Sequence, residues 1–330
     1  MNKMTLEERK KWFKEAKFGM FIHWGLYALP AGEWQGKRQE MGAKGVSEWL
    51  QYHFHIPYKE YEKLAEAFHP IYFNAEEWVA LAKEAGMQYM IFTAKHHDGF
   101  AMYDSKVDDF NIIQRTHYKK DVVKELAAAC QKYNMPFGLY YSHELDWREE
   151  HGGGYQIKGR PSRQDSSNSW DFSSDHKNYT LCYEKKIKPQ MEELLTNYGE
   201  LALLWFDFAD VISPAQSQEL YQMVRKYQPN CLVNSRIGNG VGDFRSTGDN
   251  KIPEEGVGDE LVESPTTLNT TWGYKTFDND WKDAEHVKAI KKHLNDRGIN
   301  YLLNIGPDYL GRIPVMAQDI LRKVGQSDPT

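Results

Sequence analysis

The chain has 330 residues, of which 27% are charged and 41% hydrophobic, and its formal net charge is −6. This composition is typical of a globular protein and excludes a largely disordered chain. The acidic balance argues against a surface for nucleic acid or an anionic membrane, so we expect neither partner. The length fits two domains or one α/β barrel. Aromatic residues reach 14%, a high fraction that core packing alone does not explain.

Three widely spaced cysteines, Cys130, Cys182 and Cys231, contain no CxxC pair. Their odd number and spacing exclude a disulfide scaffold and a thiolate zinc site, and are typical of a reducing compartment. The first residues lack the apolar core of a secretory signal, and no apolar run approaches the ~18 residues of a membrane helix. We therefore expect a cytoplasmic protein, although a chain whose signal peptide had been removed would read the same.

Short apolar runs alternate with amphipathic segments along the chain. The runs are bounded by Gly, Pro or polar residues and lack clean alternation, which favours strands buried on both faces of a parallel sheet. They cover residues 18–22, 89–93, 137–141, 203–206, 231–233 and 301–305. The predicted helices cover residues 75–85, 118–133, 175–198, 215–227, 284–295 and 315–324. This alternation predicts a parallel α/β fold in which the seventh and eighth strands are not located.

One polar stretch, residues 149–174, interrupts the alternation. It is rich in Gly and Ser, and loops of this length are commonly lids or disordered segments. Its aromatic residues Tyr155, Trp170 and Phe172 favour a lid. Because no linker and second core follow, we expect a single domain over residues 1–330 with a lid-like insertion at 149–174.

Polar side chains follow five of the predicted strands at the point where each strand ends. In a parallel barrel these ends meet at one face, where active sites are built. The residues are His23, His96, His97, Asp98, Ser142, His143, Glu144, Asp207, Asn234, Ser235 and Arg236. The sequence therefore predicts a site for a small polar ligand at this face.

Asp207 leaves a buried strand directly beside aromatic residues. It is either an aspartate that caps the next segment or a carboxylate kept ionised by cations such as Arg236, usable as a nucleophile or base. Asp249, taken by itself, is typical of a turn.

His96 and His97 are candidate metal ligands, but adjacent residues of an extended segment point to opposite faces. The sequence also lacks the HExxH spacing of many zinc sites. Hydrogen bonding to sugar hydroxyls is an equally good use, because polar groups beside aromatic rings match the two faces of a sugar. We expect no metal, and keep a metal-dependent barrel hydrolase or isomerase using His96, His97 and Asp98 as an alternative.

Seven motifs occur in order from about residue 15 to 325. They are Phe21-Ile22-His23-Trp24-Gly25, Ser47-Glu48-Trp49, Lys95-His96-His97-Asp98-Gly99-Phe100, Tyr140-Tyr141-Ser142, Leu204-Trp205-Phe206-Asp207, Thr271-Trp272-Gly273-Tyr274 and Leu302-Leu303-Asn304-Ile305-Gly306-Pro307. Together they resemble glycoside hydrolase family 29, the α-L-fucosidases.

The resemblance implies an irregular (β/α)8-like TIM barrel and a retaining glycosidase without metal or organic cofactor. The family's nucleophile falls on Asp207, which would form a covalent glycosyl-enzyme. The residues implied to bind fucose hydroxyls are His23, Glu48, His96, His97 and Arg236. Those implied to line the sugar ring are Trp24, Trp49, Tyr141, Trp205 and Trp272.

The resemblance leaves the general acid/base less defined. The stretch Asp243-Phe244-Arg245-Ser246-Thr247-Gly248-Asp249 matches a region that carries a glutamate in many members. Here the matched acid is Asp249, as in a bacterial subgroup of the lactobacillus α-1,6-fucosidase kind. Glu263, which precedes the Thr271 motif, and Glu254 are the alternatives.

The subgroup resemblance predicts hydrolysis of terminal α-L-fucosyl linkages, α-1,6 to GlcNAc, in fucosylated glycans or glycoconjugates, with transfer of fucose to acceptors as well. A non-enzyme alternative is a catalytically dead barrel that binds fucose. Many family members continue into a C-terminal β-sandwich that this sequence lacks, so we expect a homo-oligomer in which a neighbouring subunit completes the walls.

Overall fold

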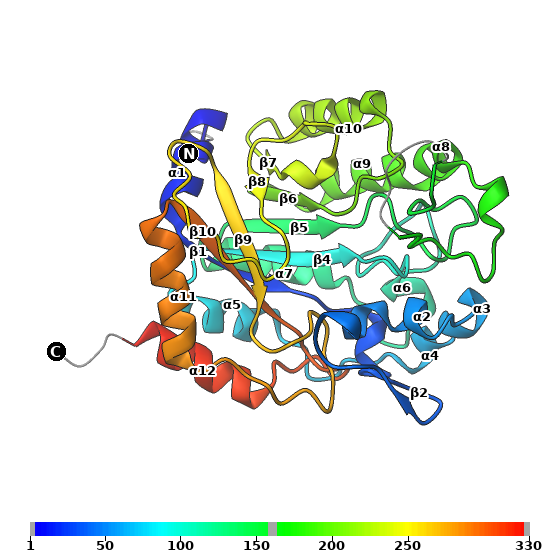
Figure 1. Ribbon diagram of the computed structural model, residues 1–330, viewed down its shortest axis with the longest axis horizontal. Helices are drawn as coiled ribbons and strands as arrows, with labels where there is room; N and C mark the ends of the chain where they lie inside the picture. The colour runs from blue at the N-terminus through cyan, green and yellow to red at the C-terminus, as the bar shows by residue number, and fades with distance from the viewer. Residues whose placement is uncertain (1–3, 158–163, 327–330) are drawn as a thin grey trace.

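The computed structural model describes residues 4–157 and 164–326. Its centre is an eight-stranded sheet in the order β7-β6-β5-β4-β1-β10-β9-β8, and every neighbouring pair is parallel (Figure 1). The strands are β1 (Phe18–Ile22), β4 (Tyr89–Lys95), β5 (Phe137–Tyr141), β6 (Leu203–Phe206), β7 (Leu232–Val233), β8 (Arg245–Ser246), β9 (Val262–Thr267) and β10 (Ile299–Ile305).

The edge strands β7 and β8 come together through a single parallel bridge between Asn234 and Phe244. The backbone N–H of Ser235 donates to the carbonyl of Phe244 at 2.8 Å. The sheet is thereby curled into an irregular (β/α)8 barrel, which confirms the predicted fold. After β10, the described part of the chain forms α12 (Val315–Gly325).

Helices cover the outside of the sheet (Figure 1). The longer ones are α5 (Ala75–Glu84), α7 (Val122–Lys132), α9 (Lys188–Asn197), α10 (Pro214–Tyr227), α11 (Ala284–Asp296) and α12. The short ones are α2 (Leu50–His53), α3 (Tyr58–Tyr61), α4 (Leu64–Ala67), α6 (Ile112–Arg115) and α8 (Tyr179–Cys182), and a hairpin pairs β2 (Glu33–Trp34) with β3 (Lys37–Arg38). Among the described residues, no helix combines the length and apolar character needed to cross a membrane.

The barrel interior is filled by side chains that alternate along the strands with those facing the helices. Phe21, Tyr89, Tyr140 and Trp205 belong to the inner cluster, whereas their strand neighbours pack outward. Because both faces are buried, the strands appear in the sequence as continuous apolar runs. A helix that the sequence analysis did not predict, α1 (Leu6–Ala16), plugs the amino-terminal end of the barrel, where the ring of Phe13 packs against Phe244 at 4.7 Å.

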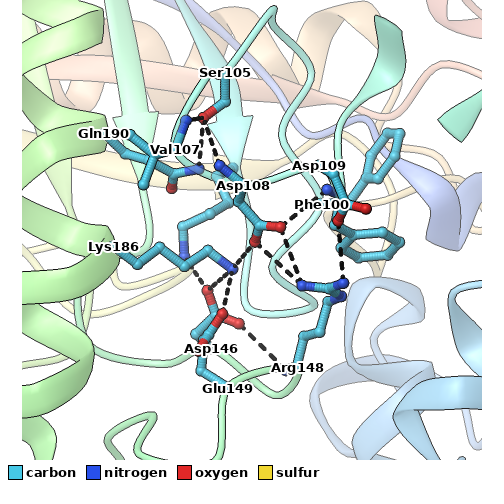
Figure 2. A network of polar contacts seen from close by, with 12 residues as sticks. Phe100, Ser105, Val107, Asp108, Asp109, Asp146, Arg148, Glu149, Lys186 and Gln190 are labelled. Carbon is cyan, nitrogen blue, oxygen red and sulfur yellow. Dashed lines mark hydrogen bonds and ion pairs between the residues drawn. The ribbon is translucent and has the colours of Figure 1, made fainter. Parts of the chain in front are cut away.

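The predicted helix over residues 175–198 is divided by a π-helical turn, Tyr183–Ile187, between α8 and α9. Within this turn Lys186 is buried and contacts Asp108 at 2.6 Å and Asp146 at 2.9 Å (Figure 2). Asp146 also accepts from Lys95, the last residue of β4, at 3.0 Å. The added residue of a π-bulge brings the Lys186 ammonium into this buried charge network. The network includes Lys95, which directly precedes His96 and His97.

Candidate active site

A cavity of about 430 Å³ opens at the carboxyl ends of the strands. Ten of the predicted site residues line it: His23, Glu48, Trp49, His96, His97, Trp205, Asp207, Arg236, Asp249 and Trp272. The face predicted from residues that follow the strands is therefore a real pocket. The cavity is also lined by residues that were not predicted from the sequence, among them Phe21, Tyr52, His53, Tyr140, Phe208, Asn250 and Thr270.

Arg236 joins the two candidate catalytic carboxylates. Its Nη1 donates to Asp207 Oδ1 at 2.9 Å, and its Nη2 donates to Asp249 Oδ1 at 2.5 Å. The guanidinium also lies over the Trp205 ring, 4.6 Å from the ring centroid. Burial opposes the charge, but the two carboxylates hold the pKa of Arg236 above its ordinary value, so the bridge stays cationic.

The carboxylate of Asp207 is oriented by donors on both oxygens. Besides Arg236, the backbone N–H of Phe208 donates to Oδ1 at 3.1 Å, and the Tyr140 hydroxyl donates to Oδ2 at 3.0 Å. Burial, reinforced by the charge of Asp207, raises the pKa of Tyr140 well above its ordinary value, so this hydroxyl keeps its proton. A carboxylate held in one orientation, directly after the carboxyl end of a buried strand, is arranged for nucleophilic attack.

His23 presents a hydrogen-bond acceptor to the pocket. Its Nδ1 lies 2.7 Å from Asn304 Oδ1, and the amide nitrogen of Asn304 donates to the Trp272 carbonyl. The Asn304 oxygen must therefore accept, so His23 carries its proton on Nδ1. Burial lowers the pKa of His23 to about 4, which leaves Nε2 as an acceptor at neutral pH.

His97 is fixed in the same tautomer. Its Nδ1 lies 2.7 Å from Ser142 Oγ, and that hydroxyl donates to the carbonyl of Leu145. Burial and the nearby Lys95 ammonium hold the pKa of His97 well below its ordinary value. Its Nε2 lies 3.8 Å from Asp207 Oδ2 and is available to accept from a ligand hydroxyl.

The expectation that His96 and His97 point to opposite faces is wrong. Strand β4 ends at Lys95, and the turn that follows brings both rings to the cavity with centroids 4.0 Å apart. Among the described residues, no group of three or more His, Cys, Asp or Glu side chains is arranged to hold a metal ion.

Glu48 and Trp49 form another wall, on a 3₁₀ turn. The buried carboxylate of Glu48 accepts from the backbone N–H of Gly273 at 2.9 Å, which ties together two of the sequence motifs. Burial raises the pKa of Glu48 to about 7. The Trp49 ring packs edge-on against His97 and lies against Phe208, with centroids 5.3 and 5.7 Å away. The wall therefore combines a carboxylate with an aromatic face.

The structure places two predicted ring-lining residues outside the pocket, so these two predictions are wrong. Trp24 is buried in the outer core against Phe73 and Trp78, and its indole donates to the carbonyl of Asp308. Tyr141 likewise points outward, where its hydroxyl donates to Gln190. Successive residues of an extended segment face opposite sides. Because His23 and Tyr140 face the pocket, their neighbours cannot.

The alternative acids lie away from the pocket lining. Glu263 is fully buried inside the barrel, where it accepts from the indole of Trp205 at 2.8 Å and the hydroxyl of Tyr89 at 2.6 Å. Glu254 is exposed on the outside, near His293 at 3.6 Å. Of the three candidates, Asp249 is the acid that shares a cation with Asp207.

The described part of the 149–174 segment borders the pocket. Gln164 and Ser166 line the cavity, and the Trp170 ring stacks on His55 with centroids 5.1 Å apart. Residues 158–163 of the predicted lid lie outside the described residues. The contacts place the segment over α2 and α3, and its action as a lid stays a prediction.

A pair of carboxyl groups in an aromatic-walled pocket at the carboxyl face of a barrel is an arrangement that glycoside hydrolases use. The family model for Alpha-L-fucosidase matches residues 1–327. The chain belongs to the α-L-fucosidase family.

Solved structures of family members resemble the chain over nearly its whole length. AlfC, an α-L-fucosidase from Lactobacillus casei in complex with its α-L-fucose product, is 50% identical with a TM-score of 0.90, covering 96% of this chain and 97% of that chain. Structures of AlfC variants include a complex with Fuca(1,6)GlcNAc and fucosyltransferase mutants. The α-L-fucosidase from Vibrio sp. strain EJY3 is 38% identical with a TM-score of 0.88, covering 98% of this chain and 55% of that chain.

Among curated relatives, human plasma alpha-L-fucosidase is 29% identical over an alignment 338 positions long, which covers 95% of this chain and 66% of the human protein. The chain spans about two thirds of the length of the curated relatives it matches.

Proposed function

We propose that the protein is an exo-acting, retaining α-L-fucosidase. The observation that carries the proposal is the Asp207–Arg236–Asp249 bridge inside the aromatic-walled pocket. A cavity of about 430 Å³ is near the lower end of small-ligand sites, which suits one terminal sugar and part of the next. Membership of the α-L-fucosidase family supports fucose as that terminal sugar.

In this proposal Asp249 takes up a proton from solvent when the substrate displaces its contact with Arg236. Asp207 then attacks the anomeric carbon and forms a glycosyl ester, while Asp249 gives that proton to the departing glycosidic oxygen. Asp249 then removes a proton from water, the water oxygen attacks the anomeric carbon, and Asp207 leaves as a carboxylate. Two inversions give net retention. A sugar hydroxyl that replaces the water would accept the fucosyl group, so transfer to acceptors follows from the same site.

The pocket offers matched partners for a fucose ring. The Nε2 atoms of His23 and His97 accept from hydroxyls, and Arg236 donates. Rings such as Trp205 and Trp272 offer apolar faces for the ring carbons and the methyl group.

For the linkage we propose α-1,6 to GlcNAc. The support is the similarity to AlfC, a variant of which has been crystallised with Fuca(1,6)GlcNAc. Hydrolysis of α-1,2, α-1,3, α-1,4 and α-1,6 fucosyl disaccharides tests this directly. A preference for α-1,6 is expected, and equal rates on all four would contradict it.

The catalytic assignment has its own test. Asp207→Ala should abolish release of fucose from an aryl α-L-fucoside. Asp249→Ala should lose activity on poor leaving groups and regain it with azide, because the small anion attacks the glycosyl-enzyme without needing a base. An active Asp207→Ala variant would overturn the proposal and favour the metal-dependent alternative. A wild type that binds fucose without releasing it from an aryl fucoside would favour the fucose-binding barrel.

We further propose a cytoplasmic homo-oligomer. The three cysteines are free thiols in buried positions, which suits a reducing compartment. Several large apolar side chains are exposed near the start of α12 and the loop before α5, including Ile71, Tyr72, Val315 and Met316. Cell fractionation and sedimentation analysis test the two statements separately.

A further inference from the structure

The carboxylate of Glu144, just after β5, is clamped by the chain that follows the proposed nucleophile. It is fully buried. The backbone N–H of Asp210 donates to Oε1 at 2.9 Å, and those of Val211 and Ile212 donate to Oε2 at 2.9 and 3.0 Å. Three convergent backbone donors form a small anion-binding nest, here filled by a side chain of the same protein.

The clamped turn, residues 208–212, begins directly after Asp207. Phe208, its first residue, has φ of +61°, a region that a bulky side chain seldom adopts. Such a conformation persists only where the surroundings impose it. The turn also leaves Phe208 in the pocket wall beside Trp49, while its N–H donates to Asp207.

Glu144 also contacts the base of the 149–174 segment. The backbone N–H of Gly153 donates to the Glu144 carbonyl at 2.8 Å. A Cβ atom at Gly153 would lie 2.4 Å from Glu144 Cγ and 2.8 Å from Val211 Cγ2. The side chain of Glu144 therefore lies against both the 208–212 turn and the start of the 149–174 segment.

We propose that Glu144 is a positioning residue for the reaction, holding the 208–212 turn so that Asp207 is aimed and Phe208 closes the pocket wall. This inference rests on the proposed fucosidase function for its kinetic part. A carboxylate suits the role because both of its oxygens accept. Glutamine would turn its NH₂ group toward at least one of the donors, so the amide satisfies the nest only in part.

The kinetic test compares Glu144→Ala and Glu144→Gln on an aryl α-L-fucoside, with Glu66→Gln as the control. Glu66 is exposed on α4 and is not among the residues that line the pocket. Because small misplacements of a reacting group are costly, kcat should fall about 100-fold for alanine and about 10-fold for glutamine, with KM within about threefold. The control should match the wild type. A folded Glu144→Ala variant with wild-type kcat would overturn the proposal.

Hydrogen exchange gives a reading that does not depend on fucosidase activity. The amides of residues 210–212 should exchange at least about tenfold faster in both variants, while the amides of β5 stay protected. Unchanged exchange in a folded variant overturns the clamp, and faster exchange with unchanged kcat overturns the positioning role. If Glu144→Ala does not fold, Glu144→Gln decides both points. A wild type that releases no fucose defeats the proposed function instead, and the exchange result still tests the clamp.

Discussion

The variant Glu263→Gln tests whether the buried charge of Glu263 lowers the stability of the fold and whether Glu263 takes part in catalysis. Glu263 lies inside the barrel, where it accepts from Tyr89 and Trp205 and has no cation in hydrogen-bond contact among the described residues. Burial raises the pKa of Glu263 from its ordinary 4.5 to about 7. Between these two values the folded chain binds a proton that the unfolded chain does not, so the stability falls as the pH rises through this window.

Above pH 7 the full cost of the buried charge is about 3 kcal/mol, because each tenfold change in proton affinity is worth about 1.4 kcal/mol. Glutamine keeps the shape of the side chain: its oxygen can accept from Trp205 and its NH₂ can donate to the Tyr89 oxygen. We therefore expect Glu263→Gln to raise the free energy of unfolding at pH 8 by up to about 3 kcal/mol, and by little at pH 4.5. With an unfolding entropy of roughly 0.7 kcal/mol/K for a chain of this size, Tm should rise by about 4 °C at pH 8.

Calorimetry at pH 8 and pH 4.5 checks this prediction. A lower Tm at pH 8, or the same shift at both pH values, would refute the electrostatic reasoning. The same variant should hydrolyse aryl fucosides with poor leaving groups as fast as the wild type. Loss of that activity with recovery in azide would assign the acid/base role to Glu263 and remove it from Asp249.

Three further predictions concern the pocket. Tyr140→Phe should lower kcat about 10- to 100-fold, because Asp207 loses a charge-assisted hydrogen bond. Tyr141→Phe should leave the kinetics unchanged and lower the free energy of unfolding by about 1 kcal/mol, as denaturant unfolding would show. Fucose should bind about three- to tenfold more tightly at pH 8 than at pH 6, because Glu48, with a pKa of about 7, accepts more strongly when ionised; calorimetric titration should find no such change in Glu48→Gln. Exhaustive chelation should leave kcat unchanged, and a loss restored by a divalent ion would favour the metal-dependent alternative.

The fold was predictable where strands are buried on both faces. The apolar runs located six of the eight barrel strands, because a strand that packs on both sides needs apolar residues throughout. Strand β9 was missed because its residues, Val262–Thr267, include a proline and a buried glutamate. Strand β8 was missed because its two residues, Arg245 and Ser246, are polar and form no apolar run. The fold places β9 through its pairing with β10, and β8 through its pairing with β9. No local sequence pattern indicates either pairing.

The site was predictable to the level of the motif and not to the single residue. The rule that polar residues after parallel strands share one face located Asp207 and Arg236. It did not say which of two adjacent residues faces inward, so Trp24 was assigned together with His23, and Tyr141 was assigned in place of Tyr140. The high aromatic fraction has two sources: rings such as Trp49 and Trp205 line the pocket, and many others, such as Trp24, fill the layer beneath the helices.

The closure of the barrel between β7 and β8 has a consequence for redesign. One bridge joins the two strands, and β8 pairs with β9 at only two positions. The loop that carries Asp249 follows this seam, so its length can change without shifting the register of the longer strands that hold Asp207. Libraries aimed at the pocket wall can therefore vary Asn250, which lines the cavity, and spare the β5–β6 half of the barrel.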